Sequence, residues 1–237
     1  MKPRTATVVL AVLLFATPAS AQLDQILKTL RLGQPNGLSD AKISSGLEEA
    51  LKIGTENAVH FTGRLDGYFK NQAIKILMPE KLQSMEKTMR AVGLGSQVDE
   101  FILSMNRAAE RAAPAAKQIF WDAIGEITFQ DAKKILSGNE TSATDYFKAK
   151  TADKLTTAFR PIVDKATDEV GVTRQYKELA GRFKSIPFVK AETVDVDQYI
   201  TTKALDGLFY MVAQEEKKIR TDPAARVTDL LKEVFGK

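Results

Sequence analysis

The sequence contains no cysteine, and among its 237 residues it has a single histidine, His60. Without cysteine the chain cannot form a disulfide framework, use a thiol nucleophile or bind metal through thiolates. One histidine also leaves a zinc, copper or iron site short of imidazole ligands. We therefore expect no cofactor and none of these three metals. Calcium and magnesium stay open, because oxygen ligands are plentiful.

Several motifs of catalysis and nucleotide binding are also missing. There is no Gly-x-Ser-x-Gly elbow to present a serine nucleophile, no phosphate-binding glycine loop and no dinucleotide fingerprint. A Ser-His-Asp site would have to use His60, which lies between Val59 and Phe61 in a helical pattern. A solvated or singly bonded structural histidine is the simpler interpretation. The sequence thus gives no support to nucleophilic catalysis.

The chain lacks blocks of charge of one sign. Its 34 basic and 30 acidic residues give a formal net charge of +4. The charges are interspersed, as in Glu215-Glu216-Lys217-Lys218. Because proteins that bind nucleic acid neutralise phosphates with clustered lysine and arginine, nucleic acid is not an expected partner.

The N-terminus has the layout of a secretory signal peptide. Lys2 and Arg4 precede an apolar run from Ala6 to Ala16, and Ala19-Ser20-Ala21 offers small residues for cleavage. The apolar run is too short to span a bilayer, and no later segment is long enough to do so. We expect residues 1–21 to be a signal peptide cleaved after Ala21, with an uncleaved N-terminal anchor as the alternative. The mature chain would be residues 22–237 in the periplasm.

From Leu23 onward apolar residues recur every three or four positions, which is typical of amphipathic helices. The sequence therefore predicts an all-α fold, a single irregular bundle of about eight helices over residues 22–237. Ser39 is expected to cap the first of these helices, and Pro114 should kink or split a long helix from about Gln97 to Ile127.

Turn and cap residues predict the other boundaries. Pro79 should open a helix that Gly93 or Gly95 ends and that buries Leu82, Met85, Met89 and Val92. Further expected boundaries are a capping box at Thr128 and Asp131, caps at Ser142 and Thr151, a helix between Gly171 and Gly181, a long loop from Ser185 to Asp195, and a last helix starting at Asp222-Pro223.

Two segments combine polar and apolar residues in a way that suggests binding. One is the interruption Leu65–Pro79 between two helices, and the other is Ser104–Glu110 on the long helix, where small alanines allow close helix packing. Positions next to the buried stripe of that helix should lie against neighbouring elements. The competing interpretations are a segment tucked over the core for Leu65–Pro79, and a capping or inter-helix hydrogen-bond role for Ser104–Glu110. The candidate ligand-binding residues are Asp66, Asn71, Asn106, Arg107 and Glu110.

One short internal echo is present. The string Leu65-Asp66-Gly67-Tyr68-Phe69 resembles Leu205-Asp206-Gly207-Leu208-Phe209. Five positions do not establish a repeat, and no period of about 20–50 residues indicates a solenoid.

Several strings together resemble one known family. They are Leu38-Ser39-Asp40, Leu65–Phe69, Pro79–Leu82, Asp99–Phe101, Ser104–Glu110, Phe159-Arg160-Pro161, Lys203–Tyr210 and Asp222–Arg226. Over about Leu23 to Gly236 the chain resembles the bacterial domain-of-unknown-function family 4197, DUF4197. The resemblance implies a single domain in the envelope of a Gram-negative cell. It implies no activity and no site residues.

These observations favour a non-enzymatic periplasmic binding protein for a small or lipidic ligand or for an envelope partner. The alternatives are a carboxylate-based hydrolase or metal-dependent enzyme, and a structural interaction protein. A cavity with convergent Asp66, Asn106, Arg107 and Glu110 would favour the enzyme, whereas a continuous apolar tunnel would favour a lipid.

Overall fold

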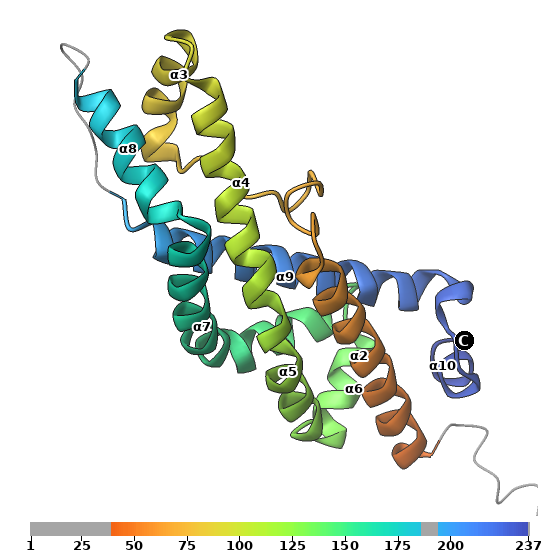
Figure 1. Ribbon diagram of the computed structural model, residues 1–237. Coiled ribbons are helices and arrows are strands. Elements are labelled where there is room, and N and C mark those ends of the chain that lie inside the picture. Colours follow the sequence, from red (N-terminus) through yellow and green to blue (C-terminus); the bar gives the residue numbers. More distant parts are fainter. Residues whose placement is uncertain (1–38, 186–193, 237) are drawn as a thin grey trace, which may run out of the picture. The chain divides into compact units, whose positions relative to one another are not determined.

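The computed structural model describes residues 39–185 and 194–236, and the regular elements there are all helical (Figure 1). The all-α prediction is confirmed. Residues 39–237 form one compact unit. The expected signal peptide, residues 1–21, and most of the loop expected at Ser185–Asp195 lie outside the described residues.

The α-helices are α2 (Asp40–Gly63), α3 (Gln83–Ala91), α4 (Gly95–Ala112), α5 (Ala116–Gly125), α6 (Phe129–Ser137), α7 (Ser142–Val170), α8 (Val172–Lys184), α9 (Val196–Thr221) and α10 (Asp229–Phe235). Short 3-10 turns lie at Glu80–Leu82, Ala113–Ala115 and Pro223–Ala225.

Several expected helix boundaries are confirmed by their capping geometry. The Ser39 side chain accepts a hydrogen bond from the backbone of Lys42 and begins α2. Thr128 and Asp131 form the expected capping box of α6. Pro114 sits in the 3-10 turn that separates α4 from α5, since proline cannot donate the helical hydrogen bond.

Other boundaries were predicted wrongly. Thr151 does not cap a helix but lies inside α7, where its hydroxyl donates to the Phe147 carbonyl one turn earlier. Gly181 lies inside α8 and does not end it. Asp222-Pro223 starts only a 3-10 turn, and Thr228 caps the last helix, α10.

Two residues near helix ends also differ from expectation. Ser142 is the first residue of α7, not its cap. Val92 is 55% exposed because it follows the end of α3, where the chain turns through Gly93 in the left-handed region. The other three members of that stripe, Leu82, Met85 and Met89, are buried as predicted.

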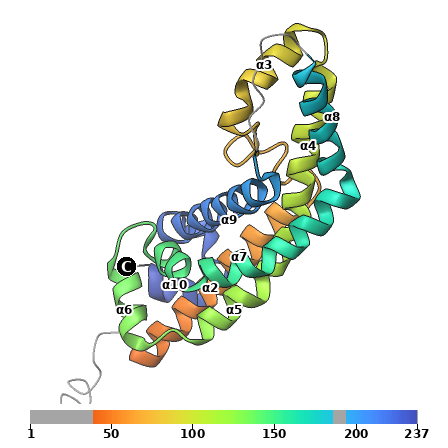
Figure 2. The same ribbon diagram turned by 90° about the vertical axis from the view of Figure 1, so that its left-hand side faces the viewer.

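The core lies where the long helices α7 and α9 pack against each other and against α2 and α4 (Figures 1 and 2). Phe120 meets Phe147 and Phe209 edge-on, with ring centroids 5.6 and 6.0 Å apart. A smaller apolar cluster of Ala50, Ile219 and Leu231 holds α10. Within the described ranges, no helix has the length and apolar character needed to cross a membrane.

Candidate functional site

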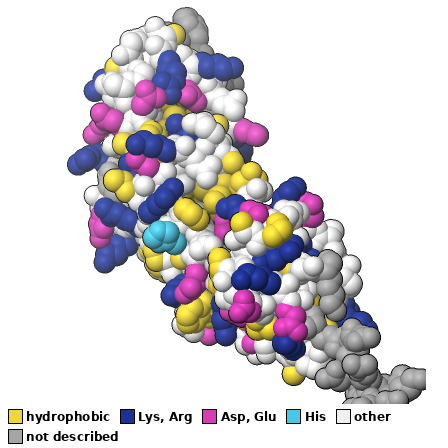
Figure 3. Space-filling view, turned by 90° about the vertical axis from the view of Figure 1, so that its right-hand side faces the viewer, with side chains coloured by type: hydrophobic (Ala, Val, Ile, Leu, Met, Phe, Trp, Pro, Cys, Tyr) yellow, Lys and Arg dark blue, Asp and Glu magenta, His cyan; other side chains and the backbone are white. Residues whose placement is uncertain are grey.

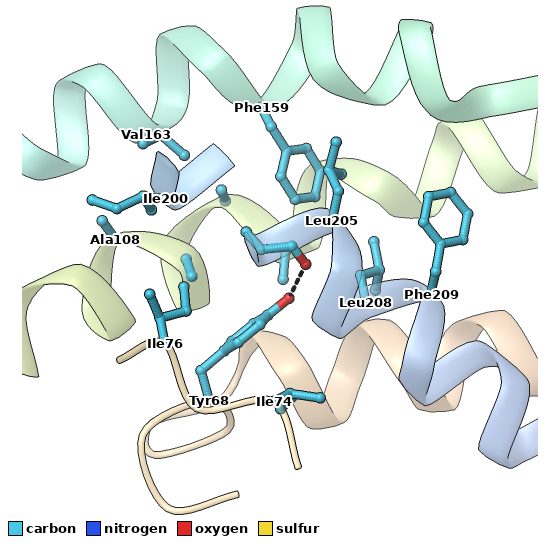
Figure 4. Packing of buried hydrophobic residues seen from close by; sticks show 14 of the residues in the cluster. Tyr68, Ile74, Ile76, Ala108, Phe159, Val163, Ile200, Leu205, Leu208 and Phe209 are labelled. Carbon is cyan, nitrogen blue, oxygen red and sulfur yellow. Dashed lines mark hydrogen bonds between the residues drawn. The ribbon is translucent and has the colours of Figure 1, made fainter. Parts of the chain in front are cut away.

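The segment between α2 and the turn at Glu80 is fastened to the core by its own side chains. Tyr68 is fully buried, and its hydroxyl donates a 2.6 Å hydrogen bond to the carbonyl of Ala204 on α9 (Figure 4). Burial raises the pKa of Tyr68 and the charge of Glu110 adds to this, so the hydroxyl remains a donor. Ile74 and Ile76 of the same segment point into the same cluster.

A tight turn aims Tyr68 at the core. Asp66 adopts the left-handed backbone region, with φ of 65°. The next residue must be glycine, because a Cβ on Gly67 would lie 2.2 Å from the Phe61 carbonyl oxygen. The Leu65–Phe69 string is therefore a structural requirement of this turn.

Glu110 of α4 binds the backbone that follows the turn. One carboxylate oxygen accepts from the amides of Tyr68 and Phe69, at 3.1 and 3.2 Å. The other oxygen forms a 2.6 Å ion pair with Arg107. Only 5% of the Glu110 side chain is exposed, so these bonds form away from water and both oxygens are engaged.

Arg107 continues the network to Asp66. Its guanidinium lies 2.6 Å from an Asp66 oxygen, and Lys70 lies 2.8 Å from the other oxygen. Hydrogen bonds from Lys70 and Arg107 lower the pKa of Asp66. Partial burial acts to lower the pKa of Arg107, but its pairs with Glu110 and Asp66 outweigh this and raise it. Asp66 and Arg107 therefore both stay charged at neutral pH.

Asn106 holds the segment at a second point. Its side-chain oxygen accepts from the amide of Ile76 at 2.9 Å, and its nitrogen donates to the Ile76 carbonyl at 2.8 Å. The same nitrogen donates to the carbonyl of Ile102 in α4. Asn106 is fully buried, and its side-chain amide bonds the Ile76 backbone as the peptide group of a neighbouring strand would.

The structure thus brings four of the five predicted site residues together. We call Asp66, Asn106, Arg107 and Glu110 the α4 clamp. Asn71 is not part of it, because it bonds the Ala73 amide and lies 3.5 Å from the Met211 sulfur. The side chains of the α4 clamp bind the chain's own backbone and one another. The clamp therefore positions the segment between α2 and Glu80, and its carboxylates are not free to act as a general acid or base.

A second buried clamp was not expected from the sequence, in which Glu215 and Glu216 stood out only as part of a run of interspersed charges. Glu216 accepts from the amides of Ala143 and Thr144 at the start of α7, both at 2.9 Å, and pairs with Arg220. Arg220 also donates to the Ile135 carbonyl at the end of α6. Apolar neighbours three and four positions away, at Val212 and Ile219, were the available signal.

An open groove of about 460 Å³ lies on the other side of the segment that the α4 clamp holds. One wall is Ala73–Gln83 and the other is the outer face of α9. Glu80, Tyr199 and Lys203 also line a second hollow toward Val194, so the two hollows are adjacent. We call this the α9 groove. Its α9 wall consists of Tyr199, Lys203, Asp206, Gly207 and Tyr210.

Two other open hollows are slightly larger than the α9 groove: one of about 560 Å³ is lined by Val59, His60 and Pro114 among others, and one of about 550 Å³ is lined by Asp168, Gly171 and Arg174 among others. The apolar pocket beneath Phe235 of α10 has about 20 Å³, which is room for about one water molecule.

His60 is exposed, and its ring lies edge-on to the ring of Phe61. Within the described part of the chain, no group of three or more acidic or histidine side chains could hold a metal ion. On the face drawn in Figure 3, charges of both signs are mixed, with apolar side chains between them.

One acidic pair lies where α7 and α9 meet. A carboxylate oxygen of Asp164 and one of Asp197 are shielded from solvent and have no hydrogen-bond partner among the described residues. Desolvation raises the pKa of Asp197, and the charges of Asp164, Asp195 and Asp168 add to the effect, although a hydrogen bond from Thr167 opposes it.

A family model described as "Protein of unknown function (DUF4197)" matches residues 37–236. The comparison with curated proteins and the comparison with solved structures gave no match.

Proposed function

The chain belongs to the DUF4197 family, and we propose that it is a non-enzymatic binding protein exported to the periplasm, where the α9 groove receives its ligand or partner. Export rests on Lys2, Arg4, the short apolar run and the small residues before Gln22. The family description assigns no activity, so the proposal rests on the groove and on what holds it.

The observation that carries the proposal is that the non-helical wall of the groove is held in a fixed position by side chains of α4. The wall Ala73–Gln83 is not helical up to Glu80, yet Asn106 holds both backbone groups of Ile76 and Glu110 holds the turn before it. A binding surface formed in advance avoids the entropic cost of ordering a loop on association. Two buried polar side chains of α4 thus keep a surface segment in one conformation.

The groove's lining suits recognition of a molecule with both polar and apolar parts. Leu77 is 59% and Tyr210 43% exposed, and both border the groove. Lys75 also lines it, stacked on the Phe69 ring with no acidic partner in the described residues. An exposed tyrosine beside a lysine without an acidic partner is typical of a site that binds a protein or an amphipathic ligand.

The carboxylate-enzyme alternative is less well supported. Glu110 and Asp66 are both already bonded to chain groups, and the groove is lined by other residues. A purely structural protein remains the second candidate, and it requires no occupant of the groove.

Native mass spectrometry of the protein purified from its own periplasm tests the proposal. We expect a mature chain beginning at Gln22 that retains a ligand or partner. The double variant Lys203→Ala/Tyr210→Ala should lose it, whereas Lys87→Ala, on an exposed position of α3, should keep it. A bare wild-type chain, or retention by all three proteins, would contradict the role of the groove. A chain that still begins at Met1 would contradict export.

A further inference from the structure

The wall of the α9 groove has the burial pattern of an extended strand. Along Ile74, Ile76 and Met78 the side chains are 7%, 1% and 3% exposed, while Leu77 between the last two is 59% exposed. Alternation with a period of two places successive side chains on opposite faces, as in a β-strand. The described residues contain no strand that pairs with it.

One edge of this strand-like segment is closed and the other is open. The Ile76 amide and carbonyl both bond Asn106 toward α4. In an extended chain the polar groups of the residues on either side point the opposite way. The Leu77 carbonyl accepts from the Tyr199 hydroxyl of α9, which places this second edge on the groove side.

Two backbone groups on the groove side have no hydrogen-bond partner within the described residues: the carbonyl of Lys75 and the amide of Leu77. A strand added in either direction can use such a pair: a parallel strand through the amide and carbonyl of one residue, and an antiparallel strand through the two residues that flank the one facing Ile76. The free pair at Lys75 and Leu77 therefore suits the addition of a strand beside Ile76.

We propose that the occupant of the α9 groove is an extended polypeptide segment, which adds to Lys75–Leu77 as a further strand and pairs with the free Lys75 carbonyl and Leu77 amide. The inference rests on the proposed binding function and specifies its partner. Peptide segments bind other proteins in this way when a free strand edge gives backbone bonds and adjacent side chains give specificity.

The side chains along the groove indicate what the peptide carries. Leu77 and Tyr210 offer apolar surface for alternate side chains of the peptide. Lys75 has no acidic partner in the described residues, whereas Lys203 pairs with Asp206 at 3.4 Å. An acidic residue of the peptide beside Lys75, next to an apolar or aromatic one, fits this lining.

The test begins with selection of linear peptides from a random library displayed on phage, using the full mature chain as target. A selected peptide is synthesised and added to isotope-labelled protein, and amide hydrogen exchange is followed by NMR. We expect the Leu77 amide to exchange at least about tenfold more slowly in the complex. The Ile76 amide should be protected with or without peptide, because Asn106 already binds it.

Matched variants complete the test. Tyr210→Ala should weaken binding of the peptide by about tenfold or more, whereas Lys87→Ala should not change it. Failure to select any peptide, or a bound peptide that leaves Leu77 exchange unchanged, would overturn the inference. If the periplasmic protein nevertheless retains a small ligand that the Lys203→Ala/Tyr210→Ala variant loses, the binding function stands and only the peptide assignment fails.

Discussion

The ring of Tyr68 occupies the space that a side chain at position 207 would need. A Cβ on Gly207 would lie 2.6 Å from a ring carbon of Tyr68 and 3.1 Å from Ile74. The two similar strings therefore meet in space through Tyr68 and Gly207. Gly67 has a different role, because its missing side chain leaves room for the Phe61 carbonyl within the turn.

Gly207→Ala is expected to destabilise the protein although Gly207 lies in the interior of α9. Overpacking of a core costs about 1–3 kcal/mol, and the helix propensity of alanine returns at most about 1 kcal/mol. Gly181→Ala is the matched control, because it is also inside a helix and has nothing within 4 Å of the added Cβ. Chemical denaturation should show a loss for the first variant and a gain for the second. An equal gain for both would refute the close contact.

Asn106→Ala removes the group that binds both polar atoms of Ile76. A buried group left without a partner costs about 1–3 kcal/mol, so we expect the free energy of unfolding to fall by at least about 2 kcal/mol. Lys87→Ala, an exposed position in α3, provides the comparison in thermal melts. Indistinguishable melting temperatures would show that Asn106 does not hold the segment.

Glu110→Gln tests whether the clamp depends on charge. The variant keeps the shape of the side chain, but its NH₂ group must face either two amides or Arg107, so one set of bonds is lost. We expect a loss of about 1–3 kcal/mol. Glu169→Gln removes a carboxylate that is 51% exposed and pairs with Arg111, and it should change stability by less than about 1 kcal/mol. Similar losses in the two variants would argue against a buried clamp.

The sequence predicted the helical class and the members of the clamp because local signals encode them. Ser39 and Thr128 cap helices through bonds a few residues away, and Asn106 and Glu110 stand beside the apolar stripe of α4. Helix continuation depends on the environment. Thr151 resembles a cap in the sequence, but inside α7 its hydroxyl bonds an earlier carbonyl and the helix continues.

The groove and the second clamp could not be predicted in the same way. The burial of Glu216 requires α7 to begin beside α9, about seventy positions away in the chain. The free backbone groups at Lys75 and Leu77 face the groove because Asn106 bonds the opposite edge of the segment, at Ile76. Both features are consequences of tertiary packing, which periodicity in one segment does not report.

The acidic pair between α7 and α9 predicts an unusual pH dependence. A raised pKa of Asp197 in the folded state gives stability that is fully present below the unfolded pKa near 3.8 and is lost as the pH rises through the folded value. Asp197→Asn removes this loss, so at neutral pH the variant should be more stable than the wild type. The difference should shrink as the pH falls.

Denaturation curves of both proteins at several pH values measure this difference. Asp153→Asn, an exposed residue of α7, controls for the removal of one negative charge. A constant offset between the wild type and Asp197→Asn at every pH would contradict the assignment. Carboxyls with lowered pKa, such as Asp66, are present in both proteins and cancel in the comparison.

Photocrosslinking in the cell of origin tests the central claim most directly. A benzophenone amino acid replaces Tyr210, which borders the α9 groove, or Lys87, which lies on α3 away from it. After irradiation, we predict a specific crosslinked protein at position 210 that is absent at position 87 and is reduced by the additional change Lys203→Ala. The absence of a crosslink at position 210, or the same products at both positions, would contradict the account of the groove as a binding site for a polypeptide partner.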